Sequence, residues 1–210
     1  MPYDLEEQEQ IASLKAWWAE NGNRVLGTVA AAALVVAGWQ GWRVWQSSQS
    51  LQASALYETL VVAAQSGDAK ALREAGGSLI ESYPRTLYAS MGALATARFH
   101  FERGDLKGAK AQLQWVVERT PSAELRDIAR LRLAAVLLDE KNHDEALKLL
   151  AAEHAAPFAA QYAALKGDVL AAKNQSAEAK TAYRLALEKA DGRNQAFRAS
   201  VQMRLDALGG

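Results

Sequence analysis

The sequence predicts an all-α protein in which one membrane-spanning helix near the N-terminus is followed by an array of helical hairpins and a final capping helix. Three observations carry this prediction. The 210 residues are dominated by helix-favouring side chains and include only 4 prolines. The stretch from Val25 to Trp42 contains no charged side chain. From Leu51 onward, short turn-like segments recur at a nearly fixed spacing.

Residues 1–24 are expected to form a cytoplasmic amphipathic leader. Asn21-Gly22 would end its helix, because both residue types tolerate the left-handed conformation of a C-cap. A helix over 5–20 would lie on the membrane surface; alternatively, its Trp pair contacts a membrane partner. The large apolar side chains that recur at spacings near three and four are Leu5, Ile11, Leu14, Trp17 and Trp18.

Residues 25–45 are predicted to be a transmembrane anchor, and this name is kept below. The 18 uncharged residues from Val25 to Trp42 would span about 27 Å as a helix, which matches the hydrocarbon thickness of a bilayer. A long, net acidic leader precedes them, so the segment is interpreted as an uncleaved anchor and not as a signal peptide. The side chains that suit the two membrane–water rims are Arg24, Trp39, Trp42, Arg43 and Trp45.

Basic residues near the anchor set its expected orientation. Lys15 and Arg24 precede it and Arg43 alone follows closely, which places the N-terminus in the cytoplasm and, in a bacterium, the C-terminal domain in the periplasm beside the inner membrane. Gly38 and Gly41 lie near the outer end of the anchor. Small residues permit another helix to pack closely, so the anchor is also a candidate docking surface.

Residues 46–210 are predicted to form a periplasmic domain of repeated helix pairs. Four similar stretches end at Leu72, Ala109, Ala146 and Ala179, which are separated by 37, 37 and 33 positions. A helix, a tight turn and a second helix recurring about every 34 residues is the tetratricopeptide plan. The units are placed at 53–84, 86–121, 124–158 and 160–191, with a capping helix at 195–208. The alternative is an irregular helical bundle with chance spacing.

Residue sizes inside each unit test this alignment. The plan needs a small residue on the first helix, where its partner approaches, and a large residue on the second. The fourth unit fits, with Gly167 on its first helix and Tyr183 on its second. The first unit has the sizes exchanged, with Leu60 and Gly76 at the corresponding positions. It is therefore interpreted as degenerate or as a cap.

The sequence offers no constellation for catalysis, metal binding or a cofactor. It contains no cysteine, and His100, His143 and His154 lie far apart in the predicted array. Asp127 and Arg130 are expected to be ordinary charges on solvated helix faces. The net charge of zero argues against a nucleic-acid partner. These features predict a protein-binding module and not an enzyme, without a small-molecule substrate.

A repeat array presents a concave surface lined mainly by the first helix of each hairpin. Such a groove would be apolar with one guanidinium and would suit an amphipathic or unfolded segment better than an acidic tail. Under the competing interpretation, several of its residues belong to the core. We expect a Leu94→Glu or Phe101→Glu substitution to abolish partner capture without loss of helix. The repeat register places the following residues on or beside the groove: Tyr57, Met91, Leu94, Arg98, Phe101, Ile128, Leu131 and Leu138.

Two stretches of the chain carry a family resemblance. The leader contains WWAENG at 17–22 and the anchor ends in GWQGWRVW at 38–45. Together with a membrane-proximal helix and a degenerate repeat array, they resemble the YfgM family over essentially the whole chain. Members of that family are described as ancillary subunits of the SecYEG translocon with a tetratricopeptide-like periplasmic domain.

The resemblance implies a single-pass inner-membrane scaffold with its N-terminus inside the cell. It implies association with SecYEG and with a membrane-anchored periplasmic chaperone of the prolyl-isomerase type, to which newly translocated proteins would be handed. It also implies a link to negative regulation of an envelope stress phosphorelay. The rival interpretation is a tetratricopeptide adaptor for another envelope assembly or for cytochrome maturation.

Overall fold

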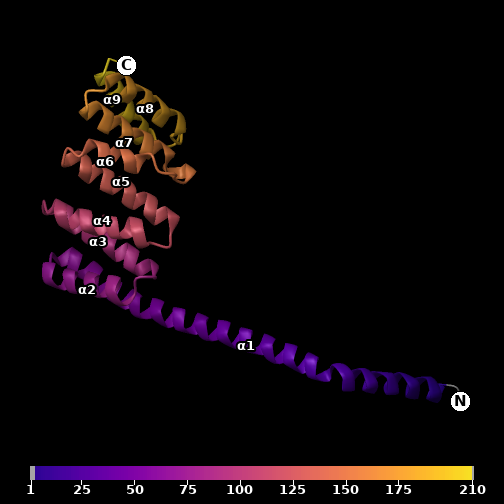
Figure 1. Cartoon of the computed structure of the whole chain (residues 1–210). Helices are drawn as coiled ribbons and strands as arrows, with labels where there is room; N and C mark the ends of the chain where they lie inside the picture. Colours follow the sequence, from indigo (N-terminus) through magenta and orange to yellow (C-terminus); the bar gives the residue numbers. More distant parts are fainter. Residues whose placement is uncertain (1–2, 210) are drawn as a thin grey trace. The chain divides into compact units, whose positions relative to one another are not determined.

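The computed structural model describes residues 3–209, and the regular secondary structure in this range consists of nine α-helices and one short 3-10 helix (η1), with no strand (Figure 1). The all-α prediction is confirmed. The chain divides into two compact units, 1–48 and 49–210. The helices are α1 Tyr3–Ser66, α2 Ala69–Ser82, α3 Leu87–Glu102, α4 Leu106–Arg119, α5 Ala123–Asp139, α6 His143–Leu150, η1 Ala156–Phe158, α7 Ala159–Ala172, α8 Ser176–Lys189 and α9 Gln195–Ala207.

Helix α1 is continuous over 64 residues, so the predicted helix end at Asn21-Gly22 is wrong. Asn21 donates from Nδ2 to the carbonyl of Trp17 one turn earlier, and the indole of Trp18 lies against Gly22. Asn and Gly permit a helix to end but do not force it to, because neither lacks the backbone N–H that a helix needs. The side chain of Leu5 lies outside the described residues.

The second unit consists of helical hairpins that follow one another in chain order (Figure 1). The C-terminal part of α1 pairs with α2, and α3–α4, α5–α6 and α7–α8 are the later pairs. Each of the four hairpin turns has one residue in the left-handed region, with φ between 62° and 77°. These residues, spaced by 37, 37 and 33 positions, are Gly67, Gly104, Lys141 and Asn174.

The residue after each left-handed position is the N-cap residue of the second helix of its hairpin, and in the first two hairpins its side chain makes the capping hydrogen bond. The Asp68 carboxylate accepts from the backbone N–H groups of Lys70 and Ala71, each at 3.0 Å. Asp105 accepts from Gly108 N–H at 2.8 Å. Side-chain oxygens at this position satisfy N–H groups that have no partner inside the helix. The recurring turn is thus a left-handed residue followed by a cap, which explains the spacing seen in the sequence.

Size complementarity holds the paired helices close together. Gly167 of α7 is buried against the ring of Tyr183 of α8, and a Cβ added at Gly167 would overlap that ring. In the first hairpin Leu60 of α1 is fully buried and in ordinary contact with Gly76 of α2, since its Cδ1 would lie 3.5 Å from a Cβ added there. The atom closest to that Cβ would be Thr96 Oγ1 of α3, at 2.9 Å. Gly76 therefore allows α3 of the next hairpin to approach α2 closely.

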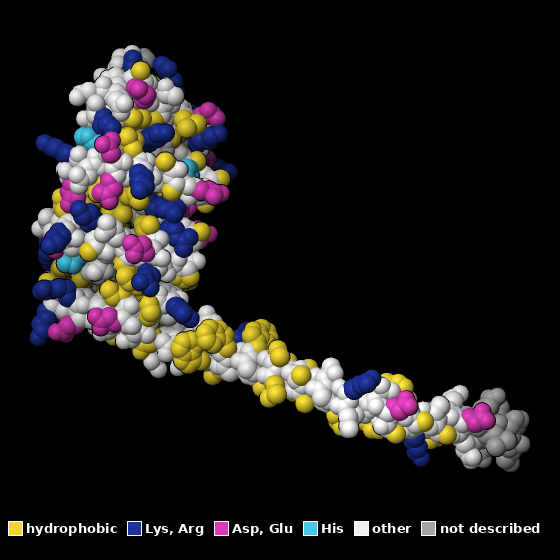
Figure 2. Space-filling view, viewed as in Figure 1, with side chains coloured by type: hydrophobic (Ala, Val, Ile, Leu, Met, Phe, Trp, Pro, Cys, Tyr) yellow, Lys and Arg dark blue, Asp and Glu magenta, His cyan; other side chains and the backbone are white. Residues whose placement is uncertain are grey.

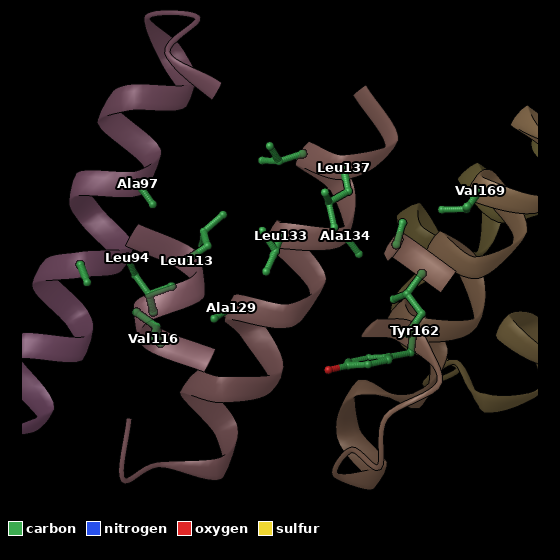
Figure 3. Close-up of a cluster of buried hydrophobic side chains, with 14 residues drawn as sticks. Leu94, Ala97, Leu113, Val116, Ala129, Leu133, Ala134, Leu137, Tyr162 and Val169 are labelled. Atoms are coloured by element: carbon green, nitrogen blue, oxygen red, sulfur yellow. The ribbon is translucent and has the colours of Figure 1, made fainter. Parts of the chain in front are cut away.

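The largest buried cluster runs through the middle of the array, from α3 to α7 (Figure 3). Leu94 of α3 lies beside Leu113 and Val116 of α4, and Leu137 of α5 also contributes a fully buried side chain. Tyr162 and Val169 of α7 form the other end of the cluster. This apolar interior is what a repeat array needs in order to hold neighbouring hairpins in one continuous stack.

Helix α9 covers the C-terminal end of the array through buried Val201 and Leu205. Two arginines of α9 tie the cap to the last hairpin. Arg198 donates to the carbonyl of Leu187 of α8 at 2.7 Å. Arg204, although exposed, donates to the carboxylate of Asp168 of α7 at 3.0 Å.

We expect Gly167→Ala to lower the free energy of unfolding of the array by about 1–3 kcal/mol, because the added methyl group cannot fit beside the Tyr183 ring. Gly77→Ala is the matched control. No atom lies within 4 Å of a Cβ placed there, so the better helix propensity of Ala should stabilise it by up to about 1 kcal/mol. Thermal unfolding of both full-length variants in detergent, followed by circular dichroism, measures the difference. Equal effects of the two substitutions would contradict the packing argument.

Candidate functional site

The predicted groove residues separate into three groups. Leu94 is 7% exposed and belongs to the core, so its expected place on the open surface is wrong. Its side chain lies beside Leu113 and Val116 of α4 (Figure 3). Arg98, Met91 and Phe101 are exposed on α3. The remaining predicted groove residues are half-buried against the core clusters: Tyr57, Ile128, Leu131 and Leu138.

Two hollows lie along the first helices of the hairpins, and both are bordered by Arg98. The first, called the α3–α5 groove, has a volume of about 330 Å³. Its lining consists of Ala97, Arg98, Phe101, Leu113, Arg132, Ala135 and Val136. The second, called the α1–α3 groove, has a volume of about 350 Å³. Its lining consists of Val61, Ala64, Gln65, Ala95, Arg98, Phe99 and Glu102.

Helical spacing explains why these side chains converge. On α3, Ala97 and Phe101 are four residues apart and share one face of the helix. On α5, Arg132 and Val136 have the same relation. Alanine at 97 and 135 leaves the space that larger side chains would fill, and Leu113 of α4 reaches the groove from beneath. The α3–α5 groove is therefore a space bordered by the long side chains of Arg98, Phe101 and Arg132, with apolar residues at its base.

The α3–α5 groove carries two guanidinium groups, one of which the sequence analysis missed. Arg98 donates from Nε to Glu102 Oε1 at 2.7 Å, and this hydrogen bond raises the pKa of Arg98. Arg132 makes no hydrogen bond or ion pair with another side chain among residues 3–209. Burial, and then the like charge of Arg98, lower the pKa of Arg132. Both groups stay charged at neutral pH because arginine titrates far above it.

A buried polar cluster joins α5 to α7. Asp127 is 3% exposed, so its assignment to a solvated face is wrong. Its carboxylate accepts from the backbone N–H of Ala155 at 2.9 Å, and the Tyr162 hydroxyl donates to it at 3.4 Å. Burial raises the pKa of Tyr162 to about 12, with the Asp127 charge contributing in the same direction. These partners are 28 and 35 residues away in sequence, which is why the periodicity of α5 could not reveal them.

The same cluster orders the loop that leads into α7. Arg130 lies 3.4 Å from the Asp127 carboxylate and donates to the carbonyl of Glu153 at 3.0 Å. The imidazole of His154 stacks on the Tyr162 ring with centroids 4.0 Å apart. A carboxylate that accepts several hydrogen bonds at a loop fixes that loop in one conformation. The cluster therefore has a structural role in holding α7 against α5.

The described residues contain no group of three His, Asp or Glu side chains that could hold a metal ion. His100 contacts Asp105 at 2.8 Å in the α3–α4 turn, and His154 belongs to the cluster above. The His100 contact joins α3 to the turn that follows it, and the His154 contact joins α7 to the loop that precedes it. These two histidines therefore stabilise connections between helices.

The anchor exposes its hydrophobic side chains along α1 (Figure 2). By length and composition, α1 is the one described helix able to cross a membrane. Arg43 lies over the Trp39 ring at 5.2 Å, and the rings of Trp42 and Trp45 are 5.1 Å apart. The other predicted anchor and interface residues are also accessible: Trp17, Trp18 and Arg24 are exposed, and no atom lies within 4 Å of a Cβ placed at Gly38 or Gly41.

Comparison with known proteins agrees with this architecture. Residues 15–210 match the family described as "Tetratricopeptide repeat-like domain". A protein of Neisseria gonorrhoeae named "Ancillary SecYEG translocon subunit" is 33% identical over 209 residues, covering 99% of this chain and 100% of its own length. The chain belongs to the YfgM family. Relatives of the same name in Haemophilus influenzae and Escherichia coli are 32% and 28% identical over 87% and 84% of this chain.

Membership in the YfgM family confirms the family resemblance and, with the helical hairpins, the tetratricopeptide-like array. The matches run through both the anchor and the array. These YfgM relatives are named as translocon subunits and not as enzymes. The groove and the anchor, and not a catalytic centre, are therefore the surfaces to which function is assigned below.

The two groove substitutions should behave differently. Leu94→Glu places a carboxylate in the core and is expected to cost several kcal/mol of stability and to lower the thermal midpoint strongly. Phe101→Glu changes a side chain that is 43% exposed, so the array should stay folded with a midpoint within a few degrees of the unaltered chain. Thermal unfolding of both variants measures the two midpoints and tests whether Leu94 belongs to the core. A Leu94→Glu chain as stable as the Phe101→Glu chain would place Leu94 on the open surface after all.

Proposed function

We propose that this protein is a single-pass adaptor of the bacterial inner membrane that associates with the SecYEG translocon. The observation that carries the proposal is the end-to-end match to the Neisseria gonorrhoeae translocon subunit, which includes both the anchor and the array. A similarity confined to the array would support only a generic protein-binding module. Here the match also includes the membrane segment. It therefore supports, for this chain, the membrane location of the relative as well as its fold.

The proposed topology has the N-terminus in the cytoplasm and the array, residues 46–210, in the periplasm. Lys15 and Arg24 before the anchor, against Arg43 after it, support this orientation. The exposed tryptophans near the end of the anchor support a membrane–water interface at that point. The array then lies on the side of the membrane where translocated chains emerge.

The finer proposal is that the array links newly translocated proteins to a membrane-anchored, prolyl-isomerase-like periplasmic chaperone. Its support is the family resemblance, together with the two hollows along α1, α3 and α5, which suit a polypeptide segment. The anchor would contribute a docking surface of its own. Gly38 and Gly41 leave open space on α1, where a neighbouring transmembrane helix can approach closely.

A photo-activatable side chain placed at Trp39, Trp42 or Trp45 is expected to crosslink to SecYEG subunits in intact inner membranes, because these side chains are exposed on the anchor. The matched control is the same group at Glu118, an exposed position on α4 of the array. Mass spectrometry identifies the adducts. Adducts from the anchor positions to other envelope assemblies alone would contradict the translocon proposal and would favour the rival adaptor function.

A companion measurement locates the contact. Full-length protein purified in mild detergent is compared with a chain whose residues 25–45 are replaced by an unrelated transmembrane helix. Loss of the translocon subunits on replacement assigns their recognition to the anchor. Retention of the subunits assigns it to the array, and the docking role of Gly38 and Gly41 is then wrong.

A further inference from the structure

The α3–α5 groove has a positive charge that the array itself leaves unbalanced. We propose that this groove binds an extended, internal polypeptide segment that presents a carboxylate side chain beside a large apolar one. The inference deepens the proposed adaptor function and rests on it for the biological source of the segment. The groove chemistry itself is independent of the translocon.

The unbalanced charge is that of Arg132 on α5, and Arg98 of α3, which is paired with Glu102, adds further hydrogen-bond donors beside it. Arg132 of α5 lines the groove and has no ion-pair partner among residues 3–209. Arg98 of α3 uses only its Nε in its contact with Glu102, which leaves its two terminal nitrogens available as donors. Two guanidinium groups around one hollow favour an incoming carboxylate, which either fork can bind through paired hydrogen bonds. The same groups disfavour a segment rich in Lys or Arg.

The floor between the arginines is apolar. Phe101 is 43% exposed at one edge, and Leu113 and Val136 form the base between the two alanines described above. The volume of about 330 Å³ lies at the lower end of the range of about 300–1,000 Å³ that is typical of ligand pockets. This is room for one bulky side chain and not for a folded domain. Recognition therefore combines one apolar side chain with a neighbouring carboxylate.

The arrangement of the grooves indicates an internal segment and not a chain terminus. Arg98 borders both the α3–α5 groove and the α1–α3 groove, which has a volume of about 350 Å³. An extended chain rises about 3.3 Å per residue, so a segment that enters both hollows needs several residues and passes over Arg98 between them. Such a segment continues beyond the two hollows at each end.

The second guanidinium refines the preference predicted from the sequence. With Arg98 as the single guanidinium, the groove was expected to suit an amphipathic or unfolded segment better than an acidic tail. Arg132 adds a preference for a carboxylate within the segment. It lies four residues before Val136 on the inner face of α5, which is the helical spacing from which it could have been recognised.

The test uses full-length protein in detergent and a nonapeptide, Gly-Ser-Gly-Phe-Glu-Leu-Gly-Ser-Gly, blocked at both ends so that Glu carries its only charge. A matched peptide has Gln in place of Glu, and a neutral fluorophore reports binding by anisotropy. We expect the Glu peptide to bind at least about tenfold more tightly than the Gln peptide, as a charge-assisted hydrogen bond predicts. In Arg132→Gln this ratio should fall toward one, and in Arg132→Lys it should be intermediate because the charge remains without the fork.

Arg119→Gln is the matched control variant, since it removes the same charge from an exposed position on α4 that borders neither groove. It should keep the full ratio, and unchanged thermal midpoints show that each variant is folded. Equal binding of the Glu and Gln peptides, or an equal loss in Arg119→Gln, overturns the proposal. The proposal is also overturned if a peptide that ends in Phe-Leu with a free carboxylate binds more tightly than the blocked Glu peptide.

Co-purification of SecYEG subunits, measured on the same preparations, separates the two proposals. If the subunits co-purify while the peptides are not discriminated, the groove proposal fails and the adaptor function stands. If the unaltered chain discriminates the peptides but brings down no translocon subunit, the adaptor function fails instead.

Discussion

The close approach of the two helices in each hairpin is the constraint on which the array depends. It requires small residues where another helix comes close. Gly167 makes room for the Tyr183 ring inside the fourth hairpin, and Gly76 makes room for Thr96 of α3 between the first hairpin and the second. Protein interiors are packed so densely that neither an extra methyl group nor a missing ring is accommodated without loss. The first unit is thus fully built into the array despite its departure from the repeat pattern.

The groove follows from this packing. Because the paired helices meet closely, Leu113 of α4 reaches the floor of the hollow between α3 and α5. Alanines on the two first helices then leave an opening, and Arg98 and Arg132 border it. The polar cluster around Asp127 fixes α7 against α5 on the other side of the same helix. The face of α5 that carries Asp127 therefore stabilises the packing against α7, whereas the face that carries Arg132 borders the groove.

Sequence reasoning succeeded where the determinant is local or periodic. The turns were recognisable from the four similar stretches, because a residue in the left-handed conformation recurs in every hairpin turn at the same spacing. It failed where the partner is distant in sequence. Asp127 looked solvated because Ala155 and Tyr162, which bury it, belong to another hairpin. Leu94 was placed on the open surface because the register fixes the helix face only to within about one residue, or 100°.

The most direct test of the packing constraint is a double-mutant cycle on Gly167 and Tyr183. Gly167→Ala alone introduces overlap, and Tyr183→Ala alone leaves a cavity, with an expected cost of about 3–5 kcal/mol. If the two side chains share one space, the double variant should be more stable than the sum of the single effects by at least about 1 kcal/mol. Additive losses would show that Gly167 and Tyr183 do not compete for the same volume, and would contradict the packing account of the array.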